Sequence, residues 1–426
     1  MRRVATVFRL PAAPTTLRSV RVLFLSPGYP PEMQQFTRGL AAVGASVIGV
    51  GDTPTSQLPR GVRDALDDYL HVPRALDEAD VTARLERWLR GKWVDRVETN
   101  WEVLMYLAAD LRKRWGLPGM RRDAILGFRD KVAMRERVAA AGIRVPHSAR
   151  VLSATDAWAA AEAIGYPLVF KPIAGAGSAD TWIASSRQEL EIVLARTRHV
   201  PEASVEELIE GDEYTYETIC ADGLPLHEGV TRYYPNVLEA RKNEAISPII
   251  LTVRDRTPPI IARAVEMGRK ALTALGMGSG FTHMEWFHSK KTGEPVFGEV
   301  ACRAPGANMV DLMNYAGDVD LFVEWARAIV EGRVTASPEQ KYHAAIVFFR
   351  ARGQGRITAH EGLGPFVARH RAGIARVDLV PIGAPRRDWR QTFLSDGNIV
   401  VRDRDHDVAL ALAREAADTI RLHARP

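Results

Sequence analysis

Residues 21 to 51 contain two short apolar runs separated by an amphipathic segment. The runs are RVLFL at 21–25 and VIGV at 47–50, and the segment SPGYPPEMQQFTRGLAAVGAS between them begins with a Gly/Pro loop. Apolar runs of this length are typical of buried strands, and a helix between two such strands makes them parallel neighbours in one sheet. The start of the chain is therefore predicted to form a βαβ unit.

The alternation of strand and helix patterns continues and divides the chain into four parts. In order, they are a tail at 1–20, an α/β domain at 21–125, a central α+β domain at 126–332 and a smaller, mostly β domain at 333–426. Within the central part, a β/α unit at about 146–204 has the size of a lid, and a helix at 408–423 is expected to close the last part. A chain of 426 residues is too long for one core, which agrees with this division.

The composition argues against nucleic acids and membranes as binding partners. The 57 basic and 52 acidic residues leave a formal charge of +5 without a long basic block, which argues against nucleic-acid binding. No apolar run approaches the roughly 18 residues of a membrane span, and the first residues lack the apolar core of a secretory signal. Cys220 and Cys302 have no CxxC spacing, which suits a reducing compartment. We therefore expect a cytoplasmic protein with no nucleic-acid or membrane partner.

Two carboxylates and an arginine lie close together in the stretch GFTHMEWFHSKKTGEPVFGEVACRAPGAN at 280–308. Glu285 lies near the end of one expected strand and Glu299 near the end of the next, and Arg303 follows four residues later. Magnesium prefers carboxylate oxygen and shares its other positions with water and substrate phosphates, so two carboxylates facing one cleft suffice. The planar fork of Arg303 suits a phosphoryl or acyl-phosphate oxygen. The competing interpretation is a surface hairpin with ordinary charges.

Two lysines and a glycine loop indicate a site for phosphates. Lys131 opens an expected helix, and Lys171 ends the apolar run PLVFK directly before the loop that contains Gly175, Gly177 and Ser178. Lysines in one cleft neutralise polyphosphate oxygens, and glycines let backbone N–H groups approach them. Most lysines are merely solvated and glycine turns between strands are common, so neither feature identifies a site alone. A strand rather than a helix follows the loop, which excludes a Rossmann fingerprint.

The segment VEELIEGDEY at 205–214 is typical of a hinge between two strands, with a turn at Gly211. Backbone groups from Glu207 to Ile209 are candidates to pair with an adenine edge, and Glu213 is a candidate to bind ribose hydroxyls. The competing interpretation is that these acids cover a solvated face.

In this order along the chain, the motifs resemble those of the ATP-grasp superfamily. They are DK at 130–131, FKP at 170–172, the glycine loop, VEELIEGDEYT at 205–215, ME at 284–285 and GEVACR at 298–303. The resemblance covers about residues 21–332, and the last strands resemble the closing domain of many members. Two patterns, THxE and ExAxRxxGxNM, are similar to those of the L-amino-acid ligases of the dipeptide-antibiotic type. Here they are THME at 282–285 and the set Glu299, Ala301, Arg303, Gly306, Asn308 and Met309.

The resemblance implies a fold and a set of roles. The fold is a multidomain α/β and α+β arrangement, with a pre-ATP-grasp βαβ domain, an ATP-grasp domain with a mobile lid and a small, mostly β C-terminal domain. ATP binds between two subdomains, with Mg²⁺ as the metal and Mn²⁺ as its alternative. The implied roles are Lys131 and Lys171 on the phosphates, Gly175 to Ser178 as the flap, Glu206 and the Glu207–Ile209 backbone on adenine, Glu213 on ribose, Glu285 and Glu299 on the metal, and Arg303 on the acyl-phosphate.

The implied activity is that of an ATP-dependent carboxylate-amine ligase. A small-molecule carboxylate is converted to an acylphosphate with release of ADP, an amine displaces the phosphate, and an amide or peptide bond forms. Lys171 and Arg303 are the catalytic residues in this scheme. Three alternatives remain open: a carboxylase or formate-using ligase of the same superfamily, a non-catalytic ATP-binding protein, and a phosphotransferase that activates no acid. Exposed edge strands in the first and last domains are compatible with a homodimer.

The sequence departs from its relatives in residues that concern the substrates. Ala301 replaces a frequent asparagine, as it does in the dipeptide ligases, and Lys242 and Ala245 stand where those ligases tend to have an acid and a histidine. We expect a carboxylate that lacks a free α-amine or carries extra negative charge, bound by Arg232, Arg241 or Lys242, unless these cations are merely solvated. Small Ala307 predicts room for a larger substrate. His283, Gly306, Ala307 and Asn308 complete the candidate substrate residues.

Overall fold

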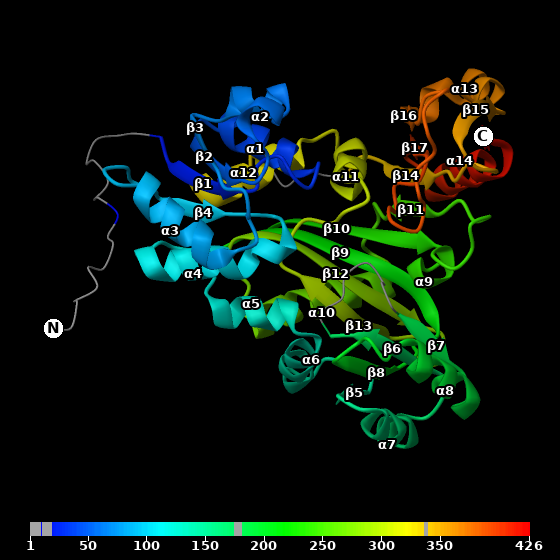
Figure 1. Ribbon diagram of the computed structural model, residues 1–426. Helices are drawn as coiled ribbons and strands as arrows, with labels where there is room; N and C mark the ends of the chain where they lie inside the picture. Colours follow the sequence, from blue (N-terminus) through cyan, green and yellow to red (C-terminus); the bar gives the residue numbers. More distant parts are fainter. Residues whose placement is uncertain (1–9, 11–18, 174–180, 336–339) are drawn as a thin grey trace.

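The computed structural model describes residues 10, 19–173, 181–335 and 340–426. Figure 1 shows an N-terminal α/β unit, a small lid unit and a larger unit built on one long sheet that runs toward the C-terminal helices. No helix in the described part of the chain is both long and apolar enough to cross a membrane.

The N-terminal unit contains the predicted βαβ opening. β1 pairs with β2 in parallel, and the sheet has the order β3-β2-β1-β4. Its strands are β1 (Arg21–Leu25), β2 (Ser46–Gly51), β3 (Asp68–His71) and β4 (Arg96–Glu98), and its helices are α1 (Met33–Ala42), α2 (Arg60–Ala65), α3 (Glu78–Trp88) and α4 (Met105–Trp115). Val22, Leu23 and Phe24 are fully buried, which explains why β1 is an uninterrupted apolar run.

The lid unit is an antiparallel sheet in the order β5-β8-β6-β7, with two helices and a core of its own. Its elements are β5 (Ser148–Val151), α7 (Ala154–Ile164), β6 (Leu168–Pro172), β7 (Trp182–Ala184), α8 (Arg187–Arg196) and β8 (Ala203–Glu207). Ser153 and Ser186 cap the two helices by accepting from the N–H groups of Asp156 and Glu189. The lid therefore packs as a separate small body at one end of the long sheet (Figure 1).

The long sheet has eight described strands in the order β13-β12-β9-β10-β11-β14-β17-β16. The bounds are β9 (Gly211–Ala221), β10 (Leu224–Tyr234), β11 (Ile249–Thr252), β12 (Gly280–Ser289), β13 (Pro295–Ala301), β14 (His343–Phe348), β16 (Ile374–Leu379) and β17 (Gly397–Asp403). All of its pairings are antiparallel. Alternate residues of β9, β10, β11, β12, β14 and β17 enter different hydrophobic clusters, so most of the sheet has a hydrophobic core on both faces.

Helices cover both faces of this sheet. α10 (Pro259–Leu275) and α14 (His406–Thr419) lie on one face, and α11 (Met309–Gly317) and α12 (Leu321–Glu331) lie on the other. α12 also packs against α1 so closely that a Cβ on Gly39 would lie 2.4 Å from the carbonyl oxygen of Phe322. The N-terminal unit is therefore joined to the long sheet through α12.

The remaining elements show where the sequence analysis was incomplete. They are α5 (Arg122–Arg129), α6 (Lys131–Ala140), α9 (Val237–Ala240), β15 (Arg356–Glu361), α13 (Leu363–His370) and β18 (Arg421–Arg425). The closing helix expected at 408–423 ends at Thr419, because the following residues pair with β15 as β18. The boundary predicted between residues 125 and 126 falls inside α5, and the long sheet continues across the boundary predicted at residue 332.

Candidate active site

A cavity of about 820 Å³ lies between the lid and the long sheet, and we call it the larger cavity. Its walls come from α6, from β6 and β8 of the lid, from the segment after β8 and from β12 and β13. The predicted nucleotide and metal residues that line it are Lys131, Lys171, Glu206, Glu207, Ile209, Glu213, Glu285 and Glu299. The fold thus collects into one cleft residues that are far apart in the sequence.

The pairing of β12 with β13 places the two predicted metal carboxylates side by side. Glu285 is directly opposite Glu299 in the antiparallel register. The register shifts just after Glu285, because Gly298 is an extra residue in β13 and forms a bulge. A Cβ on Gly298 would lie 2.8 Å from the carbonyl oxygen of Glu285, so a larger residue would force the strands apart. The bulge therefore ends the regular pairing at the position where both carboxylates face the cleft.

Lys131 reaches this carboxylate pair from the first position of α6. The carboxylate of Asp130 accepts hydrogen bonds from the N–H groups of Val132 and Ala133, at 2.9 and 3.0 Å, and so caps the helix. The Nζ atom of Lys131 lies 3.0 Å from Oε2 of Glu299. The cap fixes where α6 begins and thereby fixes where Lys131 enters the cleft.

Lys171 and Arg135 share the buried carboxylate of Glu206. The Nζ atom of Lys171 lies 3.0 Å from Oε2 of Glu206 and 3.5 Å from Oε2 of Glu299. Arg135 binds both oxygens of Glu206, with Nη2 at 2.6 Å from Oε2, and each side chain is 5% exposed. The sequence analysis assigned Glu206 to adenine. Its carboxylate is paired with two cations, Lys171 and Arg135, and the role at adenine stays a prediction.

The cations determine which carboxylates are ionised. Burial raises the pKa of Glu299, but the ammonium groups of Lys131 and Lys171 outweigh burial and hold this pKa below its ordinary value. Burial also opposes ionisation of Glu206, yet Lys171 and Arg135 lower its pKa to about 2. Glu213 behaves differently, because burial and the nearby Glu285 raise its pKa to about 8. At neutral pH Glu206 and Glu299 are therefore charged, whereas Glu213 is mostly protonated.

The predicted hinge is held at both ends by hydrogen bonds. The N–H groups of Glu207 and Leu208 donate to the carbonyl oxygens of His147 and Pro167, at 2.8 and 3.2 Å. The carboxylate of Glu207 pairs with Arg144 at 2.6 Å. Glu213, which the sequence assigned to ribose, accepts a hydrogen bond from the N–H of Val237 at 2.7 Å. The segment between the lid and β9 is therefore an ordered wall of the larger cavity.

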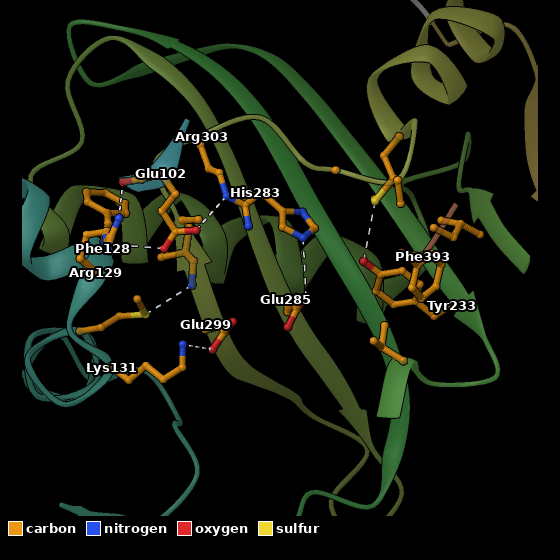
Figure 2. Close-up of a pocket in the computed structure, with 18 of the residues that line it drawn as sticks. Glu102, Phe128, Arg129, Lys131, Tyr233, His283, Glu285, Glu299, Arg303 and Phe393 are labelled. Atoms are coloured by element: carbon orange, nitrogen blue, oxygen red, sulfur yellow. Dashed lines mark hydrogen bonds and ion pairs between the residues drawn. The ribbon is translucent and has the colours of Figure 1, made fainter. Parts of the chain in front are cut away.

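A second cavity, of about 210 Å³, adjoins the first, and we call it the smaller cavity. The two cavities have Lys131, Val237, Glu285 and Glu299 in common. Figure 2 shows the charged groups of the smaller cavity between Phe128 on one side and Tyr233 and Phe393 on the other. The carboxylate pair and Lys131 therefore lie at the junction of two spaces, one large and one small.

Arg303 enters the smaller cavity from the loop after β13 and is held by an acid from the N-terminal unit. Its Nε donates to Oε2 of Glu102 at 3.0 Å, and its Nη1 donates to the carbonyl oxygen of Ala304 at 2.8 Å. Arg129, at the end of α5, donates to the backbone carbonyl of Glu102 and lies 3.7 Å from Oε1 of that residue. The position of Arg303 thus depends on contacts between three separate segments (Figure 2).

His283 connects a buried acid to the carboxylate pair. Its Nδ1 lies 2.8 Å from Oε1 of Glu217, the residue directly opposite on β9, and its Nε2 lies 3.7 Å from Oε1 of Glu285. Burial lowers the pKa of His283, but the two carboxylates outweigh burial and raise it to about 9. A protonated His283 therefore donates to the fully buried Glu217 and faces Glu285, which lies two residues further along the same strand.

The predicted substrate residues divide into two groups. Those that line the smaller cavity are Arg241, His283, Gly306 and Ala307. Three others, Arg232, Lys242 and Asn308, do not line the smaller cavity. Arg232 pairs with Asp212 at 2.7 Å and lines neither cavity. Lys242 lines the larger cavity instead, and Asn308 lines neither and precedes α11 with a φ of 55°. Gly175, Gly177 and Ser178 lie outside the described residues.

Several residues of the two cavities carried no recognised motif. They are Glu102, Phe128, Arg129, Arg135, Tyr233 and Phe393, and the buried Glu217 behind His283 carried none either. The sequence could have identified Arg135, because it lies four residues after Lys131 and therefore on the same face of the helix. Glu217 can be recognised as the partner of His283 only once the register between β9 and β12 is known. Glu102 and Phe393 come from segments that meet the site only in the folded chain.

The carboxylate pair fits magnesium only when a ligand accompanies the ion. Among the described residues, no three His, Cys, Asp or Glu side chains form a ready-made cation site. Glu285 and Glu299 supply two hard oxygen donors, which suits magnesium that completes its shell with water and phosphates. Glu299 already neutralises Lys131 and Lys171. The arrangement therefore fits a magnesium ion that binds together with phosphates. The phosphates would replace Glu299 as the partners of Lys131 and Lys171.

Known proteins resemble the chain in both sequence and fold. The family model described as carbamoyl-phosphate synthase L chain, ATP binding domain, matches residues 130–210. An uncharacterized protein of Sinorhizobium fredii is 28% identical, over 84% of this chain and 73% of that protein. An L-arginine-specific L-amino acid ligase of Bacillus subtilis is 25% identical, over 54% of this chain and 56% of that enzyme. The crystal structure of an L-amino acid ligase from Bacillus licheniformis has a TM-score of 0.77 at 18% identity and covers 96% of this chain and 100% of that one.

These matches confirm two predictions. The chain has the predicted multidomain α/β and α+β fold, and it resembles the ATP-grasp ligases, including those of the L-amino-acid ligase type. The family match falls on the segment that carries Lys131, Lys171 and Glu206. The matched region spans little more than half of the Bacillus subtilis ligase.

Proposed function

We propose that the protein is an ATP-dependent carboxylate-amine ligase that forms an amide or peptide bond through an acylphosphate. The observation that carries this proposal is the junction of the two cavities at Lys131, Glu285 and Glu299. A cleft of about 820 Å³ is large enough for a nucleotide, and the adjoining 210 Å³ suits a small acid and amine. Groups that bind phosphate and metal lie where the two spaces meet, which is where a phosphoryl group would be transferred.

Nucleotide binding in this scheme is an exchange of partners. Lys131 and Lys171 leave Glu299 and bind the phosphates, and Glu285 and Glu299 become free to hold magnesium. The metal, when bound, neutralises charge that develops on the transferred phosphoryl group. Arg135 keeps Glu206 neutralised during the exchange, since it contacts both carboxylate oxygens. When the cleft is empty, the ion pairs therefore neutralise the charges of Glu299 and of the two lysines.

Arg303 is the residue that distinguishes acid activation from simple phosphoryl transfer. It lies in the smaller cavity beyond the carboxylate pair, with Arg129 and Arg241 also on the lining. Such cations favour a carboxylate substrate, and the fork of Arg303 suits the oxyanion that forms when an amine attacks the acylphosphate carbonyl. Phe128, Tyr233 and Phe393 add apolar surface that excludes water from this intermediate.

The size of the smaller cavity favours a ligase over an enzyme for bicarbonate or formate. A single water needs roughly 10–15 Å³, so the 210 Å³ here far exceeds the needs of a one-carbon acid. The aromatic lining also favours a substrate with an apolar part. Of the three cations predicted to bind an acid with extra negative charge, Arg241 lines this cavity, whereas Arg232 and Lys242 do not.

The test is a phosphate-release screen over pairs of carboxylates and amines, including acids without an α-amine. ATP-dependent release that needs both partners, with a coupled product seen by mass spectrometry, supports the proposal. Hydroxylamine in place of the amine should trap the activated acid as a hydroxamate. Release driven by bicarbonate or formate without an amine would favour the carboxylase alternative, and a stable phosphorylated product would favour a phosphotransferase. ATP binding without turnover in the full panel would favour a non-catalytic role.

A further inference from the structure

A third cavity, of about 340 Å³, lies away from the two described above, and we call it the arginine pocket. It is enclosed by the segment 244–247, by the residues that follow β14 and by the junction between α14 and β18, at the C-terminal end of the molecule (Figure 1). Its lining residues include Arg350, Arg352, Arg386, Arg421, Glu244 and Ser247. Phe349, Ile420 and Leu422 are buried beneath them and give the pocket an apolar base.

The charges of the arginine pocket are unbalanced. Four arginines and one glutamate line it. Arg386 is the arginine with carboxylate partners, since its Nη2 lies 2.8 Å from Glu244 and its Nε lies 3.8 Å from the buried Asp396 behind the lining. Within the described part of the chain, Arg350, Arg352 and Arg421 form no ion pair with a carboxylate. Guanidinium groups gathered around a recess without matching carboxylates attract anions. The pocket is therefore a cationic hollow rather than a closed salt-bridge network.

Arg350 is the best evidence that this hollow is a built site. It is 8% exposed, and its Nη1 donates to the carbonyl oxygens of Ala240 and Asn243 at 2.9 and 2.6 Å. Its guanidinium lies over the ring of Trp389, at 4.4 Å from the centroid. Its Nε is buried and has no hydrogen-bond partner among the described residues. The group is thus fixed in position in the wall of the pocket by backbone carbonyls and an aromatic ring, and no described carboxylate neutralises it.

We propose that the arginine pocket binds a small oxyanion, either a phosphate group or a pair of carboxylates. The arginine forks match the two-point geometry of both groups. A volume of about 340 Å³ is within the range of small-molecule sites and holds a compact metabolite rather than a peptide. Ser247 adds a hydroxyl donor at the rim.

The arginine pocket is connected to the active-site cavities by one short segment. Arg241 lines the smaller cavity, Lys242, Asn243 and Ile246 line the larger cavity, and Glu244, Ala245 and Ser247 line the arginine pocket. An anion that binds Arg386 competes with Glu244 for the same guanidinium. Release of Glu244 loosens the segment that carries Lys242 and Asn243, so occupancy of the arginine pocket should change nucleotide affinity severalfold.

Calorimetric titration of the full-length protein tests this site. Inorganic phosphate, glycerol 3-phosphate and succinate are titrated separately, with the larger cavity first saturated by a non-hydrolysable ATP analogue and magnesium, and with ionic strength held constant by chloride. At least one anion should bind with saturation, and the three arms identify whether phosphate, a phosphate ester or a dicarboxylate is preferred. The variants Arg352→Ser and Arg421→Ser should weaken binding by on the order of tenfold.

The matched control is Arg404→Ser, which removes an exposed arginine outside the arginine pocket and should leave anion binding unchanged. Melting temperatures of the variants verify that they fold. Absence of saturable binding for all three anions overturns the site, and so does equal binding by wild type and the two pocket variants. An ATP-analogue Kd that does not respond to the preferred anion overturns the link to the active site. These results do not depend on the proposed ligase activity.

Discussion

The two cavities that meet at Glu285 and Glu299 are built in different ways. In the larger one, Lys131, Lys171 and Arg135 are paired with Glu206 and Glu299, and these residues belong to the central segment of the chain. In the smaller one, the contacts come from the N-terminal unit, the long sheet and the C-terminal segment, as Glu102, Tyr233 and Phe393 show. The nucleotide side is therefore a local charge network, whereas the substrate side is an assembly of distant parts.

The two sides also differ in how their charged side chains are neutralised and held in position. On the proposed nucleotide side, cations and anions already neutralise each other, and in our scheme a nucleotide with magnesium replaces both sets of partners at once. On the substrate side, Arg303 depends on Glu102 from another unit, so its position changes if the units move relative to each other. We expect substitutions on the two sides to separate nucleotide binding from turnover, and the following predictions test that separation.

The largest effect is expected for Glu299→Gln. This change removes a carboxylate that we propose as a metal ligand and that Lys131 and Lys171 share. Since a bound metal is worth several kcal/mol of transition-state stabilisation, turnover should fall by roughly a thousandfold or more, and more magnesium should be needed. Phosphate release across a magnesium titration measures both effects. Glu294→Gln, on the same hairpin but 54% exposed, should behave like wild type, and near-normal turnover in the Glu299 variant would refute the assignment.

The next effect is expected for Arg303→Ala. Loss of one oxyanion donor costs roughly 3 to 4 kcal/mol in other enzymes, so kcat should fall about a hundred- to a thousandfold while nucleotide affinity stays near that of wild type. Calorimetry with an ATP analogue and single-turnover kinetics measure the two quantities separately. Glu102→Gln should weaken the hold on Arg303 and produce a smaller loss in the same direction. If both variants lost nucleotide binding instead, the division between the two sides would be wrong.

A pH-dependent effect is expected for His283, whose pKa in the folded protein is raised to about 9. A histidine with a raised pKa stabilises the fold fully below its unfolded pKa of about 6.5, and this stabilisation is lost as the pH rises through 9. The shift corresponds to on the order of 3 kcal/mol. Urea unfolding of wild type and His283→Gln at pH 6, 7.5 and 9.5 should show a difference that shrinks with rising pH. A difference that is constant over this range would mean that His283 does not carry the proton.

The smallest effect is expected for Ala307→Trp, which reduces the space on the substrate side. KM for the larger accepted acids should rise by about tenfold, while nucleotide Kd stays unchanged, because Ala307 lines only the smaller cavity. Ala307 has a φ of 54°, so Ala307→Gly is a control that keeps the backbone conformation and the open space. Unchanged activity of the tryptophan variant toward every accepted acid would contradict the role of this position.

The sequence by itself predicted the βαβ opening, the proximity of Glu285 and Glu299, and most of the charged residues of the larger cavity, but not Arg135. Local physical rules suffice there: buried strands are apolar runs, α6 begins where Asp130 caps it, and the two candidate carboxylates lie on neighbouring strands. Motifs with short spacings therefore reveal their chemistry before folding is known. The same rules failed for the closing helix, because pairing of β18 with β15 overrode the helical pattern after Thr419.

Only the tertiary structure decided the substrate side and the arginine pocket. Arg232 and Arg241 are close in sequence, yet Arg232 pairs with Asp212 whereas Arg241 lines the smaller cavity. Glu102 and Phe393 join the site because α12 attaches the N-terminal unit to the long sheet and because that sheet continues into the C-terminal segment. Contacts between residues hundreds of positions apart depend on how whole units pack, and no local spacing records that packing.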